Sequence, residues 1–127
     1  MTDSFSITNK TKSTLPRVPF DKIKNSALGK NYMLSLVFIG EKKSKELNYA
    51  YRSKNKSTNI LSFTLDEKSG EIFITPAVVK RQISKFNRKY DNLMTFLFIH
   101  GLMHLKGMEH GSTMERAESK LRKQFGV

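Results

Sequence analysis

The chain has no cysteine among its 127 residues, and it is poor in acidic residues. Without cysteine it cannot form a disulfide scaffold, a thiolate nucleophile or a cysteine-based zinc site, and such a composition suits a reducing compartment. Its most apolar stretch, residues 93–105, is 13 residues long and contains two histidines, whereas a membrane span needs roughly 20 apolar residues. The first residues lack the basic and apolar regions of a signal peptide. We therefore expect a cytoplasmic protein outside the membrane.

The shortage of acidic residues leaves a large positive charge. Lysine and arginine number 23 against 11 aspartate and glutamate residues, a formal net charge of +12 with histidine neutral. The excess is spread along the chain without forming a tail, and such a field attracts polyanions, of which nucleic acid is the commonest. A generally lysine-rich composition would give the same count, so the charge alone leaves both interpretations open.

The pattern of apolar residues predicts one α+β domain over residues 1–127. Strands are expected near residues 5–7 and over 32–39, 59–64 and 71–75. Helices are expected over 20–28 and 41–52, from Pro76 through Phe86, from Asp91 or Asn92 as N-cap, and from Ser112. The expected architecture is a mixed sheet of about four strands packed with four or five helices.

Two of these helices have more specific sequence signals. The helix over 41–52 has Leu47, Ala50 and Tyr51 at helical spacing, which predicts one apolar side. The segment from Ser112 has the form of a capping box, which predicts that a helix starts there.

All three histidines of the chain lie within residues 100–110, in the segment HGLMHLKGMEH. His100 and His104 are four residues apart, so on a helix their Cβ atoms lie about 6 Å apart on one side, as suits two ligands of one metal ion. Gly107 can end that helix in a left-handed conformation and let the chain present His110 to the same point. Three neutral imidazoles leave a fourth tetrahedral position open, which is typical of a catalytic zinc site. We therefore predict a metal site on a central helix and the turn that follows it.

Two other interpretations of the histidines compete with a catalytic metal site. The first is that these are ordinary core and surface histidines. Three histidines at this spacing, with a glycine at the turn, favour a metal site instead. The spacing also matches the zinc motif of metzincin proteases, H-E-x-x-H-x-x-G-x-x-H. In that motif the general-base glutamate follows the first histidine, but here Gly101 holds that position and Glu109 lies elsewhere. The pattern therefore argues against a peptidase.

The same segment resembles the signature of the YbeY endoribonucleases, H-G-x-L-H-L-x-G-Y-D-H. The histidines, the glycines and Leu105 match, whereas Met103, Met108 and Glu109 replace Leu, Tyr and Asp. Three weaker matches precede it in family order: Leu47-Asn48 with Arg52, Thr58-Asn59-Ile60-Leu61-Ser62-Phe63, and Gly70-Glu71-Ile72.

The resemblance implies a metal-dependent endoribonuclease of single-stranded RNA, with one Zn²⁺ per chain held by His100, His104 and His110. It implies a role on the ribosome, in maturation of the 3′ end of small-subunit ribosomal RNA and in ribosome quality control. The predicted catalytic residues are Arg52 and His100. A guanidinium fits two phosphate oxygens at once, whereas without the resemblance a solvated arginine at a helix end is the preferred interpretation of Arg52.

Some roles and functions stay open at this point. Ser62 is a candidate hydrogen-bond donor or a core serine, and Glu109 is a candidate partner of a metal-bound histidine, a candidate base or a surface acid. Two other functions also fit the sequence. One is a non-enzymatic ribosome-binding factor with a structural zinc, and the other is a metallohydrolase that acts on a different class of substrate.

Overall fold

The structure is a computed structural model that describes residues 4–109 and 111–127. These residues form one four-stranded sheet in the order β1-β2-β4-β3. The strands are β1 (Phe5–Asn9), β2 (Met33–Phe38), β3 (Ile60–Asp66) and β4 (Ser69–Ile74). β2 runs parallel to β1 and β4, and β3 pairs antiparallel with β4, so the sheet is mixed, as predicted.

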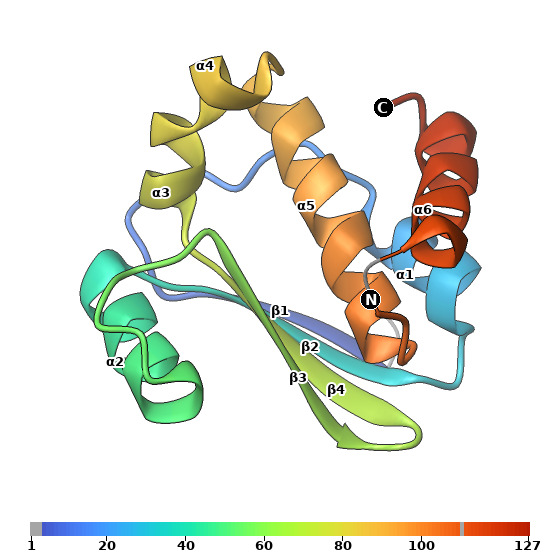
Figure 1. The fold of residues 1–127 in the computed structure, drawn as a ribbon, viewed down its shortest axis with the longest axis horizontal. Coiled ribbons are helices and arrows are strands. Elements are labelled where there is room, and N and C mark those ends of the chain that lie inside the picture. The colour runs from blue at the N-terminus through green and yellow to red at the C-terminus, as the bar shows by residue number, and fades with distance from the viewer. Residues whose placement is uncertain (1–3, 110) are drawn as a thin grey trace.

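The described residues also form six helices, which are shown in Figure 1. They are α1 (Phe20–Leu28), α2 (Glu41–Arg52), α3 (Pro76–Arg81), α4 (Ile83–Phe86), α5 (Tyr90–Leu105) and α6 (Ser112–Phe125). α5 packs on β3, and α1 and α6 pack on α5, whereas α2 stands apart from these three helices (Figure 1). The predicted α+β class is confirmed.

Helix α5 is the centre of the hydrophobic core. Ten of its 16 residues are buried, so it is apolar on most of its surface rather than along one stripe. It packs against the inward side chains of the sheet, among them Leu36, Phe38 and Ile72, each 0% exposed. At about 25 cal/mol for each Å² of apolar surface, burial of such side chains is the main term that stabilises the fold. The two histidines of α5 therefore lie on a helix that is packed into the core along most of its surface.

The side of α2 that is buried differs from the predicted one. Ala50 and Tyr51 are exposed, whereas Ser44 and Asn48 are buried. Ser44 Oγ accepts a hydrogen bond from Thr58 N (2.9 Å) and donates to Thr58 O (3.1 Å), and Asn48 Nδ2 donates to Lys56 O (2.9 Å). The prediction was wrong because α2 is held against the backbone of the loop that leads to β3, whose buried polar groups need partners.

The start of α5 differs slightly from the predicted one, whereas that of α6 agrees with it. α5 begins at Tyr90 with Lys89 as N-cap, and Asp91 lies in the first turn, where its charge favours the positive end of the helix dipole. The expected cap residues of α5, Asp91 and Asn92, thus lie within its first turn. α6 begins at Ser112, as predicted, with Gly111 as N-cap.

The predicted helix from Pro76 through Phe86 is divided in two at Gln82. Gln82 has φ −99° and ψ 0°, outside the helical range, and its N–H bonds to Val79 O three residues back. Its side-chain oxygen accepts a hydrogen bond from Asn59 Nδ2 at 2.9 Å. The hydrogen bond at this break therefore connects the segment of α3 and α4 to Asn59, the residue just before β3.

Among the described residues, no helix is long and apolar enough to cross a membrane.

Lys24 on α1 is buried, and this predicts how stability depends on pH. The side chain is 0% exposed, and burial lowers its pKa below the ordinary value of 10.5. Between the two pKa values the unfolded chain binds more protons than the folded chain, so the free energy of unfolding rises with pH in that window. We expect Lys24→Met to remove this rise, which urea unfolding at a series of pH values would measure. Equal slopes for both proteins would contradict the prediction.

Candidate functional site

The histidine segment is fixed by a close contact between α5 and the sheet. A Cβ atom on Gly101 would lie 2.8 Å from Ile60 Cδ1 and 2.9 Å from Ser62 Oγ, closer than real Cβ contacts allow. Ser62 Oγ donates a hydrogen bond to the Gly101 carbonyl at 3.3 Å. Because glycine has no Cβ atom, the helix lies directly on β3 here, and the neighbouring His100 is placed beside this edge strand.

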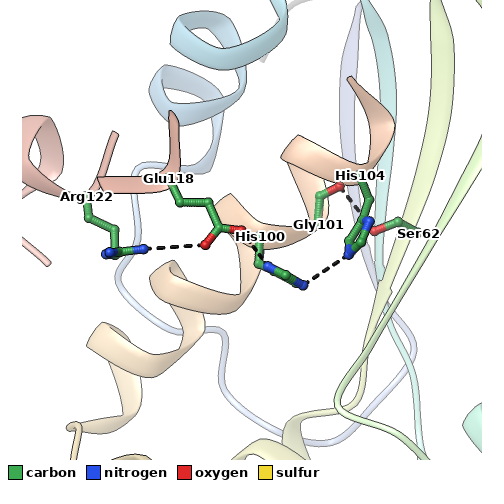
Figure 2. Close-up of polar contacts among 6 residues, drawn as sticks. All are labelled: Ser62, His100, Gly101, His104, Glu118 and Arg122. Carbon is green, nitrogen blue, oxygen red and sulfur yellow. Dashed lines mark hydrogen bonds and ion pairs between the residues drawn. The ribbon is translucent and has the colours of Figure 1, made fainter. Parts of the chain in front are cut away.

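His100 and His104 lie together, as Figure 2 shows. Their Nε2 atoms are 3.0 Å apart, and the two rings are perpendicular with centroids 4.6 Å apart. In a tetrahedral zinc site with bonds of about 2.0–2.1 Å, two ligand nitrogens are separated by about 3.4 Å. The two imidazoles therefore fit adjacent positions around one metal ion after a small adjustment.

The third predicted ligand, His110, lies outside the described residues. Within residues 4–109 and 111–127, no group of three or more histidine, cysteine, aspartate or glutamate side chains is placed to hold a metal ion. The described residues thus supply the His100–His104 pair, and the role of all three histidines as ligands stays a prediction.

Glu118 of α6 contacts the histidine pair from the other side. Its Oε1 lies 2.5 Å from His100 Nδ1, and its Oε2 lies 3.5 Å from Arg122 Nη1 (Figure 2). Glu118 is 8% exposed. Glu109, which the sequence offered as a partner of a histidine, is exposed instead. Sequence reasoning missed Glu118, although an acidic residue on the same side of a helix as Met114 and Leu121 was a usable signal.

These side chains line a cleft of about 820 Å³. The cleft lies against β3 and the two helices α5 and α6, and it reaches the last residue of α2, Arg52. The structure thus brings the exposed guanidinium of Arg52 to the same cleft as His100 and His104. Ser62 also lines the cleft, with its hydroxyl directed to the Gly101 carbonyl, so it packs the helix on the strand.

Two aromatic rings line one part of the cleft, and two arginines contact one of these rings. Phe86 and Phe96 line it, with ring centroids 6.1 Å apart. The guanidinium carbons of Arg88 and Arg122 lie 4.3 Å and 5.4 Å from the centroid of the Phe96 ring. Such cation–π contacts hold the positive charge of both arginines close to the Phe96 ring.

Together the fold and the cleft define a small α+β protein whose candidate site is lined by histidines beside the edge strand of a mixed sheet. The chain belongs to the endoribonuclease YbeY family, whose model matches residues 2–125. The family predicted from the sequence is confirmed.

Curated relatives agree with this assignment. The chain is 34% identical over 96 residues to endoribonuclease YbeY of Bdellovibrio bacteriovorus, a match that covers 74% of this chain and 61% of the relative. It is 36% identical over 108 residues to endoribonuclease YbeY of Thermodesulfovibrio yellowstonii, which covers 80% of this chain and 64% of the relative. The matched part therefore spans less than two thirds of the length of these relatives.

A solved structure has the same fold. A solution structure of a protein from Thermotoga maritima superimposes with a TM-score of 0.66, at 23% identity, and the match covers 96% of this chain and 89% of that one. At this level of identity the match supports the fold and carries no argument about the site.

Proposed function

We propose that the chain is a metal-dependent endoribonuclease that hydrolyses phosphodiester bonds of single-stranded RNA. The observation that carries the proposal is the pair of Nε2 atoms 3.0 Å apart in a cleft that Arg52 also lines. Family membership supports the RNA substrate, and the charge of +12 supports binding of a polyanion.

The metal in this proposal is one Zn²⁺ held by His100, His104 and His110. Neutral imidazole nitrogens are common zinc ligands, and the absence of cysteine leaves histidine and oxygen donors for the task. When bound, the ion supplies a Lewis acid next to the scissile phosphate. His100 thus acts in the reaction as a ligand.

Arg52 binds the phosphate in this mechanism. Its planar guanidinium donates two parallel hydrogen bonds to non-bridging oxygens, where negative charge grows as the nucleophile attacks phosphorus. It is exposed at the end of α2 and lines the cleft, so its position permits contact with a bound strand.

The biological setting of the proposal follows the family. We place the reaction in ribosomal RNA processing, at the 3′ end of small-subunit RNA and in quality control of ribosomes, with the ribosome as partner. The absence of cysteine suits the cytoplasm, which stays a prediction.

The proposal is tested by a double variant, His100→Ala/His104→Ala. We expect the purified wild-type protein to hold about one zinc ion per chain by metal emission spectroscopy, and the variant to hold none, because both described ligands are gone. Cleavage of a single-stranded RNA oligonucleotide should fall with the metal. Lys106→Ala is the matched control, since Lys106 is exposed just after α5.

Each of the other outcomes would contradict a stated part of the proposal. Equal metal content in the wild type and the double variant would refute the metal site. Metal binding without RNA cleavage would favour a ribosome-binding factor with a structural zinc. Equal cleavage by both proteins would indicate a contaminating nuclease and refute the assignment of activity to this site.

A further inference from the structure

Glu118 is an acidic side chain in an apolar setting. It lies on α6 between Met114 and Leu121, which are 2% and 8% exposed and belong to the core. A buried carboxylate without partners costs several kcal/mol, so its oxygens must be engaged. One oxygen contacts His100 and the other contacts Arg122, which places the carboxylate between two cationic or hydrogen-donating groups.

Arg122 contacts the second oxygen of the Glu118 carboxylate. Its guanidinium is four residues along α6 from Glu118 and lies 5.4 Å from the centre of the Phe96 ring of α5. A chain of contacts therefore runs from Phe96 through Arg122 and Glu118 to His100 and then to His104 (Figure 2 shows all but Phe96). The chain joins α6 to the histidine-bearing part of α5.

The contact at His100 Nδ1 decides which nitrogen of this ring carries the proton. An ionised carboxylate only accepts hydrogen bonds, so at 2.5 Å from Glu118 Oε1 the Nδ1 atom must be the donor. In a neutral ring the Nε2 atom is then unprotonated, so its lone pair can accept a hydrogen bond or bind a metal ion. That Nε2 atom is the one directed at His104 Nε2.

We propose that Glu118 is a positioning residue that holds His100 in the tautomer and ring orientation in which Nε2 binds the metal. The inference rests on the proposed function, since it assigns Glu118 a task toward the same metal. Carboxylate partners of this kind orient a ligating histidine and make it more basic, and their loss typically weakens metal binding about 10- to 100-fold.

The alternative role for Glu118 is purely structural, as an ion pair that ties α6 to α5. The two roles predict different results in Glu118→Gln. The glutamine keeps the size of the side chain, but its amide can donate to Nδ1 as readily as accept from it, so the tautomer is no longer specified. A structural role would lower thermal stability and leave the zinc affinity of the folded protein unchanged.

The experiment measures zinc affinity by competition with a chromophoric chelator, with thermal unfolding of the zinc-free proteins beside it. We expect Glu118→Gln to bind zinc about 10- to 100-fold more weakly than the wild type. Glu118→Asp should fall between them, because the shorter side chain keeps the charge and loses the reach. Glu46→Gln is the matched control, since Glu46 is exposed on α2, does not line the cleft and should leave affinity unchanged.

A second readout needs no metal. Nitrogen-15 chemical shifts of the imidazole rings in the zinc-free wild type should show the proton of His100 on Nδ1, and Glu118→Gln should show a mixture of tautomers. A His100 proton on Nε2 in the wild type would overturn the inference. So would a Glu118→Gln protein that binds zinc as tightly as the wild type, and in that case the proposed function would stand. A wild type that binds no zinc would instead remove the proposed metal site, and the inference with it.

Discussion

Replacing Arg52 with alanine should lower the rate of single-stranded RNA cleavage by roughly 100-fold, with zinc content unchanged. The guanidinium lines the cleft with His100 and His104, so its loss removes a charged donor from the phosphate while both imidazoles stay in place. Arg52→Lys should recover only part of the rate, because an ammonium group cannot make two parallel hydrogen bonds to one phosphate. Single-turnover kinetics with a labelled oligonucleotide would measure both rates.

The control for Arg52 is close by in the chain. Lys54 is exposed in the loop after α2 and does not line the cleft, so Lys54→Ala removes one positive charge without touching the phosphate position. We expect it to change cleavage only slightly. If Arg52→Ala cleaves RNA at the rate of Lys54→Ala, Arg52 is a solvated helix-end residue and has no part in the reaction.

A glutamate in place of Gly101 should lower the free energy of unfolding by about 3–5 kcal/mol. The new Cβ atom would lie 2.8 Å from Ile60 Cδ1 and 2.9 Å from Ser62 Oγ, and the carboxylate beyond it would enter the buried contact between α5 and the sheet without a partner. Gly101→Ala should cost only about 1 kcal/mol, because the better helix propensity of alanine offsets part of the overpacking.

Urea unfolding of the three proteins would measure these differences. Gly40→Ala is the control, because Gly40 has a negative φ and a Cβ atom there would meet no other atom within 4 Å. If Gly101→Glu is as stable as Gly40→Ala, then α5 does not rest on β3 at this point, and the placement of His100 needs another explanation.

What the sequence could predict was mainly local. The bounds of α1 and α2 agree with those expected, although the predicted apolar side of α2 is exposed. The proximity of His100 and His104 was also predictable, since four residues make one turn of a helix. These features depend on neighbours in sequence.

Features that depend on distant parts of the chain were missed. Glu118 is 18 residues from His100, and their contact requires α6 to fold back along α5. The buried side of α2 was mispredicted because Ser44 and Asn48 serve a loop backbone, which hydrophobic spacing does not record. The break at Gln82 follows likewise from a partner, Asn59, that lies 23 residues away. Helical periodicity contains no information about such partners.

The contact at Gly101 has a consequence for how this fold can diversify. In the zinc motif of metzincin proteases, the residue after the first histidine is the general base. In this fold the corresponding residue is Gly101, and a Cβ atom there would point toward β3 and β4. A descendant of this fold could therefore not acquire a peptidase base by one substitution there, because the new side chain would displace the helix before it could reach a substrate. Any carboxylate recruited to the histidines has to come from another element, as Glu118 does from α6. The close contact at Gly101 thus closes one evolutionary route and leaves the neighbouring helix as the place where new acidic groups can enter.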